Sequence, residues 1–143
     1  MAAKRDLLER YVELYNVGDL DACMELYADD AVQLMHDGVF EGRTEIYERL
    51  ARDLTAFPDA RYTVASFVEQ GDAFADEWTF TGTNTGPFRL PDGTEVPATG
   101  RPVELKGMEL VEVRDGKIVV DNPYYDFMAA LLQLGLVPAG AAA

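Results

Sequence analysis

The chain has 143 residues, of which 48% are hydrophobic and 27% charged, a composition typical of one folded domain. Its 12 basic and 26 acidic side chains give a formal net charge of −14 at pH 7. Nucleic-acid binders neutralise phosphates with Lys and Arg, and anionic membranes attract basic segments, so this charge argues against both kinds of partner. The single cysteine, Cys23, excludes an intrachain disulfide, and the first residues lack an apolar signal core. We therefore expect a cytoplasmic protein.

The first half of the chain repeats its apolar residues at the spacing of amphipathic helices. Leu7 to Tyr15 form one such stripe, and Gly18 can end that helix in a left-handed conformation. Cys23 falls on the buried side of a second, short helix. The residue before a proline avoids helical angles, so a third helix stops at Phe57. The predicted elements are a helix ending at Gly18, a helix over 20–27, a strand over 31–36, a turn at Asp37-Gly38, and a helix after Gly42 with Ile46, Tyr47, Leu50 and Leu54 inward.

After Pro58 the apolar period changes to two residues, as expected for strands. Gly71-Asp72 and Asp115-Gly116 are hairpin signals. The stretch 82–100 is rich in Gly, Pro and Thr and is expected to form a long loop. The predicted elements are strands over 61–68, 73–81, 103–113 and 117–122 and a helix over 127–134 capped by Gly135, in a single domain over 1–138 with a frayed tail over 139–143.

Helices followed by an antiparallel meander predict an α+β fold with the helices on one face of the sheet. We expect a cone-shaped, curved antiparallel sheet wrapped around the long N-terminal helix. Such a cone leaves an open mouth, and concavities of this kind bind small molecules.

Several segments resemble known proteins, and together they span most of the chain. RYVELYNVGDLDACMELYADDAV, residues 10–32, resembles the opening of ketosteroid isomerases. Both this group and the SnoaL-like polyketide cyclases belong to the nuclear-transport-factor-2-like superfamily, so the resemblance implies that superfamily's fold. The segments that resemble the cyclases are GDAFADEWTFTGTNTG (71–86), PATGRPVELKG (97–107), VRDGKI (113–118) and QLGLVP (133–138).

The resemblance implies roles for a few side chains. In the isomerases a helical tyrosine and a protonated acid on a late strand hold an enolate, and Tyr11 and Glu109 match these two positions. The isomerases' general base corresponds to Met35, and the catalytic aspartate of the cyclases and epoxide hydrolases corresponds to Pro123. Neither residue can accept a proton. The acids and bases nearest to these two positions are His36, Asp37 and Asp121.

Alternation along the strands selects further acids. From Val103 to Val113 the odd positions are apolar or glycine except for Glu109, so Glu109 is predicted to face the pocket. Burial would raise the pKa of this acid, which could then donate a hydrogen bond to an oxyanion, or it makes a structural hydrogen bond. Asp76 shares a face with three aromatic residues and is either a functional acid or lies at a solvated pocket mouth. Alternation leaves Asp121 undecided, and only the resemblance turns it inward.

The remaining candidates come from position and residue type. His36, the only histidine, ends the first predicted strand near the mouth and is either structural or a proton carrier. No His, Cys and carboxylate spacing suits a metal and no glycine-rich loop suits a phosphate, so neither a metal nor a cofactor is predicted. Residues predicted to contact the substrate are Tyr15, Met35, Asp37, Trp78, Phe80, Phe88 and Tyr124.

Three functions are compatible with these observations. The leading hypothesis is an enzyme that uses its own side chains to isomerise, cyclise or dehydrate an enolisable hydrophobic molecule, with Tyr11, Glu109, His36, Asp76 and Asp121 as its catalytic candidates. The second is a binding or accessory domain that uses the same pocket without chemistry. The third is a structural homodimer, suggested by Met108 and Leu110 on an otherwise polar strand face.

Overall fold

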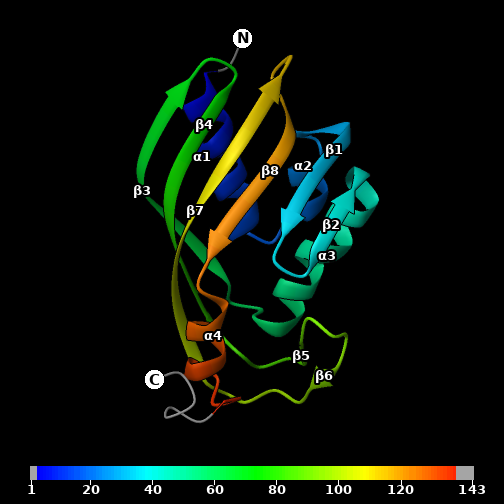
Figure 1. The fold of residues 1–143 in the computed structure, drawn as a ribbon, viewed down its shortest axis with the longest axis vertical. Coiled ribbons are helices and arrows are strands. Elements are labelled where there is room, and N and C mark those ends of the chain that lie inside the picture. The colour runs from blue at the N-terminus through cyan, green and yellow to red at the C-terminus, as the bar shows by residue number, and fades with distance from the viewer. Residues whose placement is uncertain (1–2, 138–143) are drawn as a thin grey trace.

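The computed structural model describes residues 3–137 (Figure 1). Pro138 and the predicted tail lie outside the described residues. Among the described helices, none is both long and apolar enough to cross a membrane. The elements in chain order are α1 Lys4–Asn16, α2 Leu20–Met24, β1 Tyr27–Met35, β2 Gly38–Glu41, α3 Gly42–Ala56, β3 Arg61–Gln70, β4 Ala73–Thr83, β5 Phe88–Arg89, β6 Glu95–Val96, β7 Pro102–Arg114, β8 Lys117–Tyr125 and α4 Phe127–Gln133.

A curved six-stranded sheet forms the body of the molecule, with the strand order β2-β1-β8-β7-β4-β3. Helices α1 and α3 lie on one face of it, and α4 lies against the lower part of β7 (Figure 1). The predicted α+β fold is therefore confirmed. The sheet is curved and mostly antiparallel, as predicted, and the exception is the pair β1 and β8, which run parallel. The chain crosses from β2 through α3 to the far edge of the sheet, and the returning meander brings β8 alongside β1.

Most predicted elements are present, with shifted ends. Strand β1 starts at Tyr27, so α2 is shorter than predicted, and β2 follows a turn at His36 and Asp37. The predicted inward position of Tyr47 is wrong: Tyr47 is 37% exposed, whereas Arg49 is 4% exposed. The buried stripe of α3 passes through positions 46, 49 and 50, and Arg49 can be buried there because two carboxylates pair with it.

The long segment between β4 and β7 is an ordered excursion that contains the small β5–β6 hairpin. Asn84 is fully buried and anchors it. Its Nδ2 donates to the carbonyls of Ala56 and Gly86, and its Oδ1 accepts from the backbone N–H and hydroxyl of Thr99. These bonds hold the excursion against the end of α3 and so fix one rim of the pocket described next.

Candidate active site

A pocket lies between the concave face of the sheet and the helices α1, α3 and α4. Its cavity volume is about 80 Å³, counted as the space that the centres of water molecules can occupy. One water needs about 10–15 Å³ on this measure, so the cavity is large enough for several. Most of its wall is apolar or aromatic, as in small-molecule sites. The lining residues are Leu8, Tyr11, Val12, Gln33, Met35, Leu50, Asp53, Phe57, Tyr62, Val64, Asp76, Trp78, Phe80, Phe88, Leu105, Glu109, Asp121, Pro123, Tyr125, Phe127 and Ala130.

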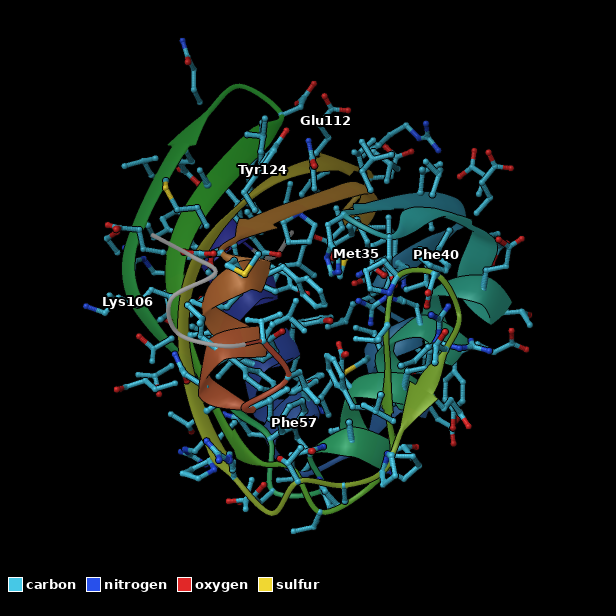
Figure 2. All side chains as sticks on the ribbon, turned by 60° about the horizontal axis from the view of Figure 1, so that its bottom comes forward. Met35, Phe40, Phe57, Lys106, Glu112 and Tyr124 are labelled. Atoms are coloured by element: carbon cyan, nitrogen blue, oxygen red, sulfur yellow. The ribbon has the colours of Figure 1, made fainter. Side chains whose placement is uncertain are left out.

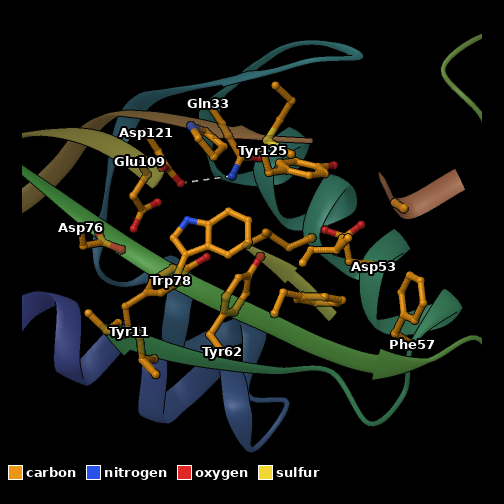
Figure 3. A pocket seen from close by; sticks show the side chains of 18 of the residues that line it. Tyr11, Gln33, Asp53, Phe57, Tyr62, Asp76, Trp78, Glu109, Asp121 and Tyr125 are labelled. Carbon is orange, nitrogen blue, oxygen red and sulfur yellow. Dashed lines mark hydrogen bonds between the residues drawn. The ribbon is translucent and has the colours of Figure 1, made fainter. Parts of the chain in front are cut away.

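Three carboxyl groups from three neighbouring strands meet at one end of this pocket (Figure 3). Asp76 on β4 and Glu109 on β7 are direct cross-strand partners, so their side chains stand next to each other on the concave face. Asp121 on β8 pairs with Val111, two residues from Glu109 and on the same face. The predicted alternation of β4 and β7 is confirmed, and it places two of the three acids.

Asp121 is held by two hydrogen bonds from buried polar residues. The Tyr27 hydroxyl donates to its Oδ2 at 3.0 Å, and Gln33 Nε2 donates to the same oxygen at 3.2 Å. The hydroxyl oxygens of Tyr27 and Tyr11 are 3.4 Å apart. A chain of polar groups therefore runs from α1 through β1 to the carboxylate on β8. The Tyr27 hydroxyl has a single hydrogen, and its shorter contact is with Asp121.

The protonation of the acids follows from their surroundings. Burial raises the pKa of Glu109 well above its ordinary value, and the nearby carboxylates of Asp121 and Asp76 raise it further. Burial also raises the pKa of Asp76 to about 6. Neighbouring carboxylates in an apolar site cannot all be ionised, because each charge disfavours the next. Of the three acids, Glu109 is therefore the one whose surroundings most favour the neutral form, which can donate a hydrogen bond.

Tyr11 remains protonated over the same pH range. Burial raises the pKa of its hydroxyl well above the ordinary value, and the neighbouring Tyr27 and Asp121 add to the effect. A buried neutral phenol is a hydrogen-bond donor. Tyr11 and Glu109 thus both line the pocket as neutral donors.

Aromatic rings form the middle of the pocket. The Trp78 ring lies edge-on to Tyr62 at 5.2 Å between centroids and 5.9 Å from Tyr125. Its position depends on Gly107, its cross-strand partner on β7, because a Cβ there would lie 2.3 Å from Trp78 Cζ2. The glycine lets the indole lie flat over the strand.

At the other side of the pocket, Asp53 on α3 is the polar lining residue (Figure 3). Arg49 Nη1 donates to Asp53 Oδ1 at 2.9 Å, and Arg49 Nε donates to Asp37 Oδ1 at 3.2 Å. Arg52 lies 3.5 Å from the second oxygen of Asp37. This network orients Asp53 from behind.

His36 does not lie among the acids. It is exposed in the β1–β2 turn, and its ring packs against Phe127 at 4.3 Å and Tyr125 at 5.2 Å between centroids. Burial lowers the pKa of its imidazole below 6.5. His36 therefore stands at the rim of the pocket, packed on two of its lining rings and apart from the three acids.

The structure separates the other predicted site residues into two groups. Tyr15 is fully buried in the core below the pocket, and Asp37 is engaged by Arg49 and Arg52. Tyr124 is 65% exposed on the outer face, because alternation along β8 turns Asp121, Pro123 and Tyr125 inward. The structure therefore corrects the predicted pocket positions of Tyr15, Asp37 and Tyr124. The predicted residues that do line the pocket are Tyr11, Met35, Asp76, Trp78, Phe80, Phe88, Glu109 and Asp121.

Sequence reasoning missed several lining residues. Tyr125 would have been found had β8 been continued past Pro123 with unbroken alternation. Asp53 lies one helical turn after Arg49, a position that only the correct face of α3 reveals. Gln33 and Tyr62 carried no signal that separated them from ordinary strand residues. Within residues 3–137, no group of three or more His, Cys, Asp or Glu side chains is arranged to hold a metal ion.

Comparison with known proteins gives one family and many solved structures. The profile of the SnoaL-like polyketide cyclases matches residues 5–134. Comparison with curated protein sequences gives no match. IdmH from Streptomyces antibioticus, provisionally assigned as a polyketide cyclase, is 31% identical over 94% of this chain and 99% of its own, with a TM-score of 0.78.

Two further structures share the fold. AclR from Streptomyces galilaeus, provisionally assigned as a hydroxylase, is 26% identical over 94% of this chain and 96% of its own, with a TM-score of 0.81. TerC, crystallised with polyporic acid, is 19% identical over 91% of this chain and 96% of its own, with a TM-score of 0.71. The last likeness concerns the fold alone.

Proposed function

This chain belongs to the SnoaL-like polyketide cyclase family, and we propose on this basis that it is an enzyme that moves a proton on an enolisable hydrophobic small molecule. The observation that carries the proposal is the meeting of Asp76, Glu109 and Asp121 with Tyr11 at one end of an aromatic pocket. Isomerisation and aldol-type cyclisation both begin with such a proton transfer. The 31% identity to IdmH supports cyclisation as the outcome.

Tyr11 and Glu109 are the proposed oxyanion donors. When a carbonyl compound loses a proton from its α-carbon, negative charge develops on the carbonyl oxygen. Neutral donors in a site shielded from water stabilise that charge, and they require no reorganisation during the reaction. Burial raises the pKa of each group, which favours the neutral form that donates.

Asp76 is the proposed general base. Its pKa of about 6 makes it an ionised but still basic carboxylate at neutral pH, close to the optimum for proton transfer. The Asp76 carboxylate takes the α-proton while the C–H electron pair forms the enolate. The enolate then takes the proton back at another carbon, or its carbon attacks a second carbonyl, whose oxygen takes the proton from Asp76 as the C=O π bond breaks. Asp121 is proposed as a positioning residue, which acts on Tyr11 through Tyr27.

A proton-exchange experiment tests these roles without knowledge of the natural substrate. A panel of aromatic ketones is incubated with the protein in D₂O, and deuterium incorporation at the α-carbon is followed by NMR. Tyr11→Phe and Glu109→Gln are each expected to lower the exchange rate by about 10²-fold or more, and Asp76→Asn by a similar factor. Glu112→Gln is the matched control, on the same strand as Glu109 but on the exposed face. The proposal would be contradicted if the wild type catalysed exchange and all three site variants did so at the same rate.

A binding domain without chemistry is the second candidate function. Met35 and Pro123, the residues at the positions where relatives are expected to hold a base, both line the pocket and cannot accept a proton. Saturable binding of the ketones with no deuterium incorporation at any pH between about 6 and 9 would favour this candidate.

We also propose that two copies associate through the outer face of the sheet. Met108 and Tyr124 are cross-strand partners on that face and are 50% and 65% exposed. Leu110 and Val68, 47% and 67% exposed, extend the same patch across Ala75 of β4. The outer patch is thus Val68, Ala75, Met108, Leu110 and Tyr124, and exposed apolar surface of this extent is typical of protein contacts.

A further inference from the structure

The charges around the pocket all have one sign. Four acids line it, and Lys, Arg and His are absent from the lining residues within the described part of the chain. Three of the acids form the cluster at one end, and the fourth, Asp53, stands across the aromatic middle from them (Figure 3). Figure 2, seen from another side, shows Phe57 and Met35 on opposite sides of the pocket and Lys106 outside the sheet.

The nearest cations are already paired. Arg49 is 4% exposed, and its guanidinium bonds Asp53 and Asp37, so a ligand cannot reach it without displacing a carboxylate. Arg52 pairs with Asp37 and lies over the Phe40 ring. His36 at the rim has a lowered pKa and is neutral above pH 7. None of the residues that line the described pocket is therefore a cation that could receive an anionic ligand.

Acceptors inside the pocket, by contrast, lack donors. Asp76 is only 2% exposed, and apart from the neighbouring Glu109 carboxyl no described group donates to either of its oxygens. Oδ1 of Asp121 is likewise buried without a partner. Asp53 uses only Oδ1 toward Arg49, which leaves its other oxygen without a described protein donor. Unpaired buried acceptors cost free energy that a ligand carrying donors would recover.

The aromatic wall between the two polar ends adds a second preference. Tyr62, Trp78 and Tyr125 form its centre, next to Asp53. Flat rings pack well in such a wall, and aromatic faces attract cations. A carboxylate in the same position would face the ionised members of this group of acids in an environment of low polarity, and like charges so placed repel each other.

We propose that this pocket selects ring-containing ligands that are neutral or cationic and rejects carboxylates, and that Asp53 receives a hydroxyl or ammonium group of the ligand at the mouth. The inference rests on the proposed function in one respect, that the pocket binds a small molecule. It adds the charge of the ligand and a specificity residue outside the acid cluster. Asp53 does not contact the reacting atoms in this scheme.

Calorimetry with three compounds of one shape tests the selection. The probes are β-naphthylmethylamine, β-naphthylmethanol and β-naphthoate, each titrated into the full chain at about pH 7.5. The amine and the alcohol are expected to bind at least about tenfold more tightly than the carboxylate, a difference of about 1.4 kcal/mol. Asp53→Asn is expected to reduce that preference by about tenfold, mainly because the amine binds the variant more weakly.

Two controls separate Asp53 from its surroundings. Glu48→Gln removes an exposed acid from the same helix and should leave all three affinities unchanged. Asp37→Asn removes the second carboxylate that pairs with Arg49, and this carboxylate lies outside the pocket. The affinities of this variant show the effect of a less firmly held Arg49 when Asp53 is still present. Circular dichroism and thermal unfolding establish that each variant is folded.

Each outcome decides the inference. Equal or tighter binding of the carboxylate overturns it, as does a preference that survives Asp53→Asn or disappears in Glu48→Gln. Failure of all three probes to bind also overturns it. Because the readout is binding, a protein that selects the amine but catalyses no α-proton exchange would refute the proposed reaction and leave this inference standing.

Discussion

Asp76 is a buried carboxyl side chain on the sheet's concave face, and its one polar neighbour among the described residues that can donate to it is the Glu109 carboxyl. Phe74 and Trp78 flank it on β4, and both are buried. A group in such a place favours its neutral form. Ionising it therefore lowers the free energy of unfolding. Functional acids are often kept at this kind of cost, since the same burial makes them better bases.

The cost of Asp76 predicts a dependence of stability on pH. Burial raises its pKa from 3.8 to about 6, so the folded state holds a proton that the unfolded state has released. Its contribution to stability is therefore present below about pH 4 and is lost as the pH rises to about 6. At pH 7.5 Asp76→Asn should be more stable than the wild type by up to about 3 kcal/mol, since one pKa unit is worth about 1.4 kcal/mol.

Urea unfolding at a series of pH values between about 4 and 8 measures this effect. The difference between the variant and the wild type should vanish near pH 4, and Glu112→Gln should show no such trend. The variant is also expected to lose α-proton exchange, so stability and activity would move in opposite directions. If the free energies of unfolding of the wild type and of Asp76→Asn differed by the same amount at every pH, ionisation of Asp76 would not destabilise the fold.

At the level of elements, strand alternation was the most informative signal in the sequence. It placed Glu109 and Asp76 on the concave face correctly, because a period of two fixes the face once one buried residue is known. It failed on β8, where the mixed pattern and Pro123 hid the continuation to Tyr125. On α3 the predicted inward positions of Ile46 and Leu50 are confirmed, and Arg49 was missed because it is charged. Its pairing with Asp37 and Asp53 allows it to be buried.

The pairing of β4 with β7 predicts the effect of one methyl group. A Cβ on residue 107 would overlap the Trp78 ring at 2.3 Å, so Gly107→Ala must push the indole into the pocket or part the strands. Overpacking of this kind typically costs about 1–3 kcal/mol. The expected result is a lower melting temperature and weaker binding of the naphthyl probes. Lys106→Ala, the exposed neighbour on the same strand, should change neither, and an unaltered Gly107→Ala variant would refute the close packing.

For the whole molecule, the order of helices and strands was enough to predict the fold class, and the resemblance added the superfamily. The parallel pairing of β1 with β8 was not predictable from local pattern, because it depends on where the chain re-enters the sheet after α3. The convergence of Asp76, Glu109 and Asp121 likewise depends on the order of β4, β7 and β8. Local patterns identify which residues face inward, and topology decides which of them meet.

The outer patch is expected to hold two copies of the chain together. Its residues come from four adjacent strands, and a net charge of −14 keeps copies apart unless an apolar contact offsets the repulsion. Light scattering coupled to size exclusion is expected to give a dimer that Leu110→Asp converts to a monomer, since the new charge would be buried at the contact. The matched control is Val39→Asp, because Val39 is 57% exposed on β2, outside the patch. A wild-type monomer at about 50 μM, well above the Kd of a stable interface, would contradict association through this face.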